Sequence, residues 1–206
     1  MSVDTSTVYL LDVATGQPIE AELRDQVELQ HVDDWHQAWR PALEDAVRDL
    51  AARGSRLPQH RHWNWAVKIA SVNGLLGHRS FCVIANGMTQ GLMRVDLTRT
   101  ARMTSHAGKP IVYVDYLETA PWNRPELVAS PRLRGVGMTL ITAAVALSVD
   151  EGFHGRIGLH SLPQADDFYR DKCKMDDLGP DAKYQNLRYF EMTAERAGAF
   201  LAKEEG

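Results

Sequence analysis

The sequence has few cysteines and no long hydrophobic run. Only Cys82 and Cys173 occur in 206 residues. Neither has a partner at metal-ligand spacing, so we expect two buried thiols rather than a disulfide framework or sulfur catalysis. No stretch approaches the roughly 18 apolar residues of a membrane span, and no charged segment followed by an apolar one opens the chain. We therefore expect a cytoplasmic protein without a membrane partner.

The sequence also lacks an excess of charge of one sign. Its 23 Lys and Arg and 27 Asp and Glu residues are mixed along the chain, and the net charge is −4. With this balance, the sequence shows no excess of positive charge of the kind that binds duplex DNA or an anionic membrane. The scattered cations Arg61, Arg99, Arg102 and Lys109 are predicted to form a solvated face. A nucleic-acid partner is therefore disfavoured, with an aminoacyl-tRNA as the one exception left open.

Repeats and low-complexity linkers are absent, and 44% of the residues are hydrophobic. We expect one domain over residues 1–206 with a buried core. Period-2 patterns and turn signals predict strands at 8–13, 21–29, 80–84, 91–97, 111–117, 156–160 and 187–192. Helices are predicted at 33–52, 133–149 and 164–172, with a short one near the C-terminus. Early hairpins followed by a strand–helix–strand–helix unit predict an α/β fold, a mixed sheet with helices on both faces.

The most informative segment lies between a predicted strand and a predicted helix. Gly135 and Gly137 remove side chains where backbone N–H groups would approach a ligand, and the start of the following helix adds its dipole and unpaired N–H groups. With the cations of Arg132 and Arg134, this is an anion site suited to a pyrophosphate. A dinucleotide fold would need a third glycine where Leu140 stands, and a P-loop would need Lys-Ser/Thr, so both are disfavoured. A plain tight turn is the alternative.

Three ordered pieces of the chain resemble the GNAT superfamily of acyl-CoA N-acyltransferases. Arg132-x-x-Gly135-x-Gly137 resembles its pyrophosphate signature, (Q/R)-x-x-G-x-(G/A). Residues 112–121 resemble the preceding strand, which in the family splays from its neighbour and pairs with the pantetheine arm. Ala165-x-x-Phe168-Tyr169 resembles the family's A-x-x-F-Y motif. The resemblance is strongest over residues 81–192 and implies a three-layer sandwich around a central mixed, twisted sheet.

The resemblance implies a cofactor and a reaction. The co-substrate would be acetyl-CoA, without a metal, and the reaction would be direct attack of a primary amine on the thioester. The strand near Leu117 and Thr119 would hold pantetheine and supply an oxyanion donor. Tyr169 would be the general acid that protonates the thiolate, and a packing tyrosine beside Phe168 is the alternative. The residues implied for the pyrophosphate are Arg132, Leu133, Arg134, Gly135, Val136, Gly137 and Met138.

Two departures from the family pattern concern the last of these motifs. Position 162 is Leu, where the family often has asparagine, and Cys173 stands where it usually has glycine. They leave the local geometry of the helix around Tyr169 open.

The general base is less clear from the sequence. Glu118 lies near the end of the strand expected to meet the thioester and could act directly or through water. A solvated or ion-paired carboxylate is the equal alternative, and Asp115 is the second choice. Strand alternation places Glu118 with Val114 and Tyr116 on one face, opposite Asp115.

An aromatic and basic stretch supplies weaker signals. His60-x-His62 has no carboxylate or cysteine partner nearby in the sequence, so we expect surface histidines and no metal. Trp63, Trp65 and Trp122 could line an acceptor pocket. For Trp65 we favour a core position.

The acceptor is not specified by these motifs. We expect an amine-bearing partner, a small molecule or a protein, and a homodimer is compatible with the pattern. A protein N-terminus, a lysine or an aminoacyl-tRNA is the alternative acceptor. The alternative from a non-enzymatic class of function is a non-catalytic acyl-CoA-binding or regulatory module of the same fold.

Overall fold

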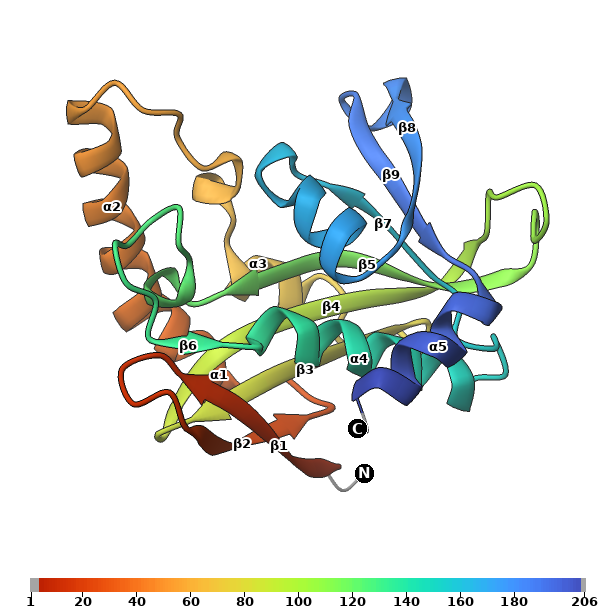
Figure 1. Cartoon of the computed structure of the whole chain (residues 1–206), viewed down its shortest axis with the longest axis horizontal. Coiled ribbons are helices and arrows are strands. Elements are labelled where there is room, and N and C mark those ends of the chain that lie inside the picture. Colours follow the sequence, from red (N-terminus) through yellow and green to blue (C-terminus); the bar gives the residue numbers. More distant parts are fainter. Residues whose placement is uncertain (1–3, 205–206) are drawn as a thin grey trace. The chain divides into compact units, whose positions relative to one another are not determined.

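The computed structural model describes residues 4–204, without the side chains of residues 203 and 204. Figure 1 shows the course of the chain. The strands are β1 (Thr5–Asp12), β2 (Pro18–Arg24), β3 (His78–Ala85), β4 (Met88–Thr100), β5 (Pro110–Thr119), β6 (Leu133–Arg134), β7 (Ile157–Ser161), β8 (Asp176–Asp181) and β9 (Leu187–Met192).

Helices of three kinds connect these strands. The α-helices are α1 (Leu29–Asp34), α2 (Arg40–Ala52), α3 (Trp65–Ala70), α4 (Val136–Asp150) and α5 (Ala194–Glu204). The π-helical segments are η1 (Trp35–Trp39) and η5 (Phe168–Lys172). Short 3₁₀ turns are η2 (Gln59–His62), η3 (Pro121–Asn123), η4 (Pro163–Ala165) and η6 (Ala182–Tyr184).

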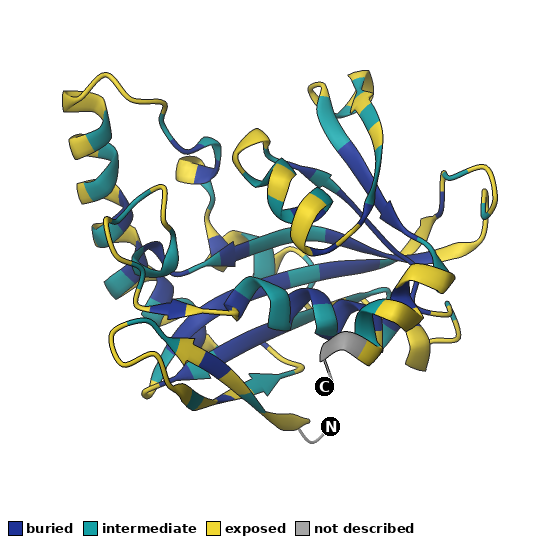
Figure 2. Ribbon diagram, viewed as in Figure 1, coloured by how far each residue is buried: buried dark blue, intermediate teal, exposed yellow. Residues whose placement is uncertain are grey.

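Nine strands within residues 4–204 form one mixed sheet in the order β6-β1-β2-β3-β4-β5-β7-β9-β8. The pair β5–β7 is parallel, whereas β1–β2, β2–β3, β7–β9 and β8–β9 are antiparallel. About half of the residues of β3 and β4 are buried, mainly residues 81–83 and 89–93 (Figure 2). The predicted α/β class, a mixed sheet with flanking helices, is confirmed.

The chain divides into two compact units. The first comprises residues 1–75, 80–93 and 117–140, and the second comprises residues 76–79, 94–116 and 141–206.

In the first unit, polar contacts fasten the early helices to the start of β4. The indole Nε1 of the fully buried Trp39 donates to the carbonyl of Thr89 at 3.0 Å. One carboxylate oxygen of Asp34 accepts from both the amide (2.9 Å) and the hydroxyl (2.7 Å) of Thr89. These bonds satisfy polar groups that would otherwise be buried without partners.

A glycine in β4 lets the first turn of α4 pack closely on the sheet. A Cβ at Gly91 would lie only 2.6 Å from Cγ1 of Val136 and 3.0 Å from Cδ1 of Leu140. A side chain at Gly91 would therefore push the start of α4 outward. The close approach fixes the position of the helix N-terminus in the first unit.

The predicted helix at 33–52 is confirmed in kind but differs in form. It starts earlier, with α1, and the π-helical segment η1 separates α1 from α2. The amide of Arg40 donates to the carbonyl of Trp35, five residues back. The next residue, Pro41, has no N–H and its ring would crowd a carbonyl of the preceding turn. A wider turn accommodates this proline without ending the helix.

In the second unit, the buried carboxylate of Glu191 holds the loop after β4. It accepts from the backbone amides of Arg102 (2.7 Å) and Met103 (3.2 Å) and from the hydroxyl of Tyr189 (3.1 Å). The pair β5–β7 supplies much of the core here, with Ile111 and Ile157 fully buried.

Several predicted boundaries are wrong. Residues 133–134 are a strand paired with β1 rather than the start of a helix, because Gly135, at φ +102°, cannot continue a right-handed helix backward. The strand predicted at 21–29 ends at Arg24, and α1 begins at Leu29. The helix predicted at 164–172 is a 3₁₀ turn followed by a π-helical segment.

Besides β6, the strand β8 was missed, whereas one predicted hairpin was correct. β8, Asp-Asp-Leu-Gly-Pro-Asp, has a composition that disfavours strands and pairs with β9 through a register shift at the sheet edge. The hairpin predicted at Asn86-Gly87 joins β3 to β4. Both turn residues have positive φ, +53° and +70°, as a type I′ turn requires.

Candidate functional site

The loop before α4 presents a helix N-terminus to solvent. Gly135 is exposed and has φ +102°, a conformation that other residues rarely adopt. Its carbonyl accepts the first helical bond, from the amide of Thr139 at 2.9 Å. The amides of Val136, Gly137 and Met138 therefore have no acceptor inside the helix and can bind an anion.

The side chains of this segment divide into two groups. Arg132 and Arg134 are exposed, and the Arg132 guanidinium lies over the ring of Trp122 at 5.2 Å. Leu133 and Val136 are buried at 5% and 2% exposure. These two could therefore contribute only backbone groups to a ligand, while the two arginines could contribute charge.

A buried glutamine anchors the approach to this loop. The Gln90 side-chain oxygen accepts from the indole of Trp122 (3.0 Å) and the amide of Asn123 (2.9 Å). Asn123 in turn accepts from the amide of Leu133 at 3.0 Å. The Gln90 backbone carbonyl accepts from Ala120 at 2.9 Å. One chain of bonds thus connects the end of β5 to the segment before Gly135.

The ladder between β5 and β7 is short. It pairs Val112, Tyr113 and Val114 with the facing residues of β7 and, within the described residues, ends there. β5 itself continues to Thr119. Leu117 and Thr119 are half-buried in this last part of the strand. Unpaired backbone groups at such a strand end can bind an extended ligand.

Glu118 is the buried carboxylate at the end of β5. It is 3% exposed, and its Oε2 accepts from the indole Nε1 of Trp65 at 2.6 Å. Its Oε1 lies 3.4 Å from Nε2 of His60. Burial raises the pKa of Glu118 to about 7, against the smaller lowering effects of Trp65, Arg124 and Lys68. A carboxylate with this pKa can accept a proton near neutral pH.

His60 stays neutral beside this carboxylate. Burial, followed by the positive charges of Arg124 and His62, lowers the pKa of His60 to about 3. Its contact with Glu118 is therefore not an ion pair at neutral pH. The Arg124 guanidinium contacts Nε2 of His60 and also donates to Glu126.

The prediction for the two histidines is half wrong. His62 is exposed as expected, but His60 is 2% exposed. Its carboxylate neighbour, Glu118, is distant in sequence, so the local pattern did not reveal the contact.

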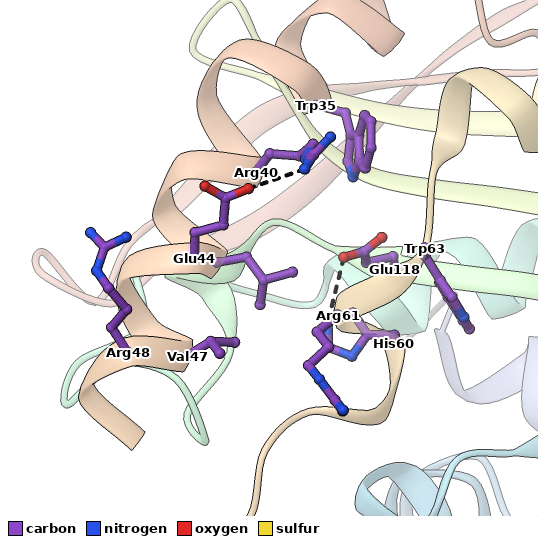
Figure 3. Close-up of a pocket in the computed structure, with 10 residues that line it drawn as sticks. Trp35, Arg40, Glu44, Val47, Arg48, His60, Arg61, Trp63 and Glu118 are labelled. Carbon is purple, nitrogen blue, oxygen red and sulfur yellow. Dashed lines mark hydrogen bonds and ion pairs between the residues drawn. The ribbon is translucent and has the colours of Figure 1, made fainter. Parts of the chain in front are cut away.

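A cavity of about 310 Å³ opens beside Glu118 (Figure 3). It lies entirely within the first unit. Its lining comprises Trp35, Arg40, Leu43, Glu44, Val47, Arg48, His60, Arg61, Trp63 and Glu118. This volume lies at the lower end of the range for small-molecule sites. Trp63 lines the cavity, whereas Trp65 is fully buried as expected and donates to Glu118, which does line it.

Asp115, the second candidate base, is held by an arginine. Arg94 donates to its Oδ2 from two nitrogens, at 2.9 and 3.2 Å. Burial raises the pKa of Asp115, and Arg94 opposes that shift. The bidentate pair leaves Asp115 less able than Glu118 to take a proton.

Tyr169 lies in the second unit, in η5. It is 7% exposed, and its ring packs against Phe168 (5.1 Å) and Phe190 (5.9 Å). The amide of Cys173 donates to the carbonyl of Phe168, five residues back. The segment in which both family departures fall is thus a 3₁₀ turn and a wide turn rather than a regular α-helix.

The described part of the chain contains neither a candidate metal cluster nor a membrane-spanning helix. Within residues 4–204, no three His, Cys, Asp or Glu side chains gather as a metal site would need. None of the helices there has the length and apolar character needed to cross a bilayer.

Sequence comparisons found nothing, but the fold has known counterparts. No family model and no curated protein matches the chain. Thermoplasma acidophilum PaiA N-acetyltransferase, in complex with coenzyme A, superposes with a TM-score of 0.54 at 10% identity, over 85% of this chain and 99% of that one. The GNAT domain of S. lividans PAT gives 0.54 at 12% identity, over 91% and 96%. Mycobacterium smegmatis RimJ, in complex with CoA-disulfide, gives 0.53 at 15%, over 100% and 98%.

Proposed function

We propose that this chain, which has the fold of the GNAT N-acetyltransferases, is an acyl-CoA-dependent N-acyltransferase that transfers an acetyl group to a primary amine. The observation that carries the proposal is the buried carboxylate of Glu118. It faces a cavity of about 310 Å³, and its pKa is raised to about 7. A primary ammonium has a pKa near 10.4 and must lose a proton before it can attack, and a carboxylate whose pKa is raised to about 7 accepts that proton more readily than one with an ordinary pKa.

The chemistry assigns each proton a destination. Glu118 accepts the proton of the ammonium, directly or through water, and the amine nitrogen then attacks the thioester carbonyl. A C–N bond forms and the C–S bond breaks. The attacking nitrogen gives up its second proton, and the departing thiolate gains one. A backbone N–H near Thr119 is proposed to stabilise the oxyanion.

The pyrophosphate of coenzyme A is proposed to bind at the start of α4. The amides of Val136, Gly137 and Met138 lack helical acceptors, and Gly135 adopts the positive φ that exposes them. Arg132 and Arg134 are exposed beside them and supply positive charge. Leu133 would contribute through its backbone alone. Two of the counterparts of this fold bind coenzyme A or its disulfide.

The pantetheine arm is proposed to pair with β5 near Leu117 and Thr119. Within the described residues the ladder with β7 ends at Val114, so β7 does not occupy the edge of β5 beside Leu117 and Thr119. Tyr169 is proposed as the acid that protonates the thiolate, on the ground of the A-x-x-F-Y motif. Its packing against Phe168 and Phe190 is also what a purely structural tyrosine would show.

A second candidate is a binding module that retains the fold without turnover. The irregular turn that carries Tyr169, where Cys173 and Leu162 depart from the family pattern, favours it. In that case the chain would bind acyl-CoA and release no thiol.

Thiol release separates the two candidates. The purified protein is mixed with acetyl-CoA and a panel of amines, and calorimetry with coenzyme A is run in parallel. We expect binding together with amine-dependent thiol release. Binding without release would favour the module, and absence of binding would overturn both.

A further inference from the structure

The charged side chains around the cavity beside Glu118 do not cancel one another. Arg40 donates to Glu44 at 3.1 Å, and Arg48 pairs with Asp45. Arg61 instead donates to the backbone carbonyl of Pro58 at 3.2 Å. Within residues 4–204, no carboxylate lies at ion-pair distance from Arg61. The cavity lining therefore retains one guanidinium without a counter-charge.

Glu118 does not supply the negative charge that Arg61 lacks, and His60 adds no charge of its own. His60 is neutral, because its pKa is lowered to about 3. Glu118 is bonded to Trp65 at 2.6 Å and lies near His60. Figure 3 shows the Arg61 side chain directed away from the Glu118 carboxylate. Glu118 and Arg61 are therefore not partners of one another.

Four further side chains of the lining are apolar or aromatic. Trp35 is 3% exposed and Leu43 is 8% exposed, so each offers only a small face to the cavity. Val47 and Trp63 add to this surface. Apolar walls with a few separated polar groups are typical of sites that fix the orientation of a small ligand.

We propose that the acceptor is an amine that also carries an anionic group, a carboxylate, on an apolar body. This inference rests on the proposed function of the same cavity. The amine lies at Glu118, the apolar body lies against the tryptophan and leucine side chains, and the carboxylate pairs with Arg61. A guanidinium binds a carboxylate with two parallel charge-assisted hydrogen bonds, which an uncharged amide cannot match.

The test uses acceptors that differ only in this charge. The pairs are 4-(aminomethyl)benzoate with 4-(aminomethyl)benzamide, and 6-aminohexanoate with 6-aminohexanamide. We expect kcat/KM for each acid to exceed that of its amide by about 10-fold or more. In Arg61→Gln, the acid-to-amide ratio should fall toward one. Arg48→Gln is the matched control, because its guanidinium is already paired with Asp45, and it should retain the preference.

Calorimetry of the same compounds keeps the two proposals distinguishable. If the acids bind through Arg61 but no thiol is released, the acyltransferase proposal fails and the ligand class stands. If thiol is released equally well with acids and amides, or Arg61→Gln leaves the ratio unchanged, the ligand class is wrong and the acyltransferase proposal stands. A preference for the amides would point to a peptide amino terminus, and absence of binding by either acid would also overturn the inference.

Discussion

The indole of Trp65 donates a hydrogen bond of 2.6 Å to the carboxylate of Glu118. Both side chains are buried, at 0% and 3% exposure. Burial disfavours the charged carboxylate, whereas the donated bond favours it. Burial is the larger effect, so the pKa of Glu118 is raised to about 7. The pair holds a proton acceptor near neutrality in a place that water reaches poorly.

Glu118→Gln keeps the shape of the side chain and removes its basic site. We expect kcat/KM near pH 7 to fall by roughly 10²-fold. Activity should partly recover as the pH approaches the pKa of the amine, because solvent then deprotonates the acceptor. The pH–rate profile of kcat/KM for both proteins measures this.

Asp115→Asn is the comparison for that experiment. Asp115 is held by Arg94 at 2.9 and 3.2 Å, so we expect a smaller loss without a selective effect at low pH. Parallel profiles for Glu118→Gln and the wild type would move the role to Asp115 or to a chain of waters.

Trp65→Phe removes the donor and should raise the pKa of Glu118 further. The acidic limb of the kcat/KM profile should then move to higher pH, because the carboxylate must be ionised to act as a base. Trp39→Phe is the matched control, since Trp39 is equally buried but donates to the backbone of Thr89. An unmoved limb in Trp65→Phe would show that Glu118 does not govern the profile.

Glu118 and His60 should act on stability with opposite signs. The folded pKa of Glu118 lies above its ordinary value of 4.5, because burial favours the neutral form. Glu118 therefore adds to the free energy of unfolding below pH 4.5, and this addition is lost as the pH rises through about 7. The folded pKa of His60 lies near 3, below its ordinary 6.5. His60 therefore adds to the free energy of unfolding above pH 6.5, and this addition is lost as the pH falls toward 3. The two effects offset each other between pH 4.5 and 6.5.

Glu118→Gln removes one of the two effects. Its free energy of unfolding, relative to wild type, should rise between pH 4.5 and 8 by an amount on the order of 3 kcal/mol. Urea unfolding at pH 5, 6, 7 and 8 measures the difference. A difference that does not vary with pH would contradict the raised pKa.

Gly135→Val should weaken coenzyme A binding by at least about 10-fold. Valine strongly disfavours φ +102°, and its Cβ would meet Leu10 at 3.4 Å, so the loop and its amides should shift. Gly54→Val is the control, because Gly54 also has positive φ, +65°, but a Cβ there would meet no heavy atom within 4 Å among the described residues beyond its chain neighbours. Calorimetry with coenzyme A on the folded variants measures both affinities. Equal affinities would remove the phosphate site from this loop.

Tyr169→Phe removes one hydroxyl and retains the ring that packs against Phe168 and Phe190. If the hydroxyl protonates the thiolate, kcat should fall by roughly 10²-fold while coenzyme A affinity stays close to that of wild type. Turnover and calorimetry are measured on the same preparation. Turnover close to that of wild type would leave Tyr169 a packing role only.

The glycine turn before α4 and the hairpin at Asn86-Gly87 were predictable because both depend on local backbone chemistry. Asn86-Gly87 and Gly135 are read from residue type alone, since positive φ is a property of the residue and its immediate neighbours. The strand at 111–117 and the last strand, β9, follow from short-range alternation in the same way.

The environment of Glu118 was decided by the tertiary structure. Trp65 is 53 positions away from Glu118 in the chain, and His60 was predicted to be a surface residue. A pKa depends on burial and on charges brought near by folding, and neither is encoded in spacing along the chain. For the same reason, residue types alone could identify Glu118 and Arg61 as charged. Only the fold shows that Glu118 lies buried beside Trp65 and that Arg61 lines the same cavity without a carboxylate partner within the described residues.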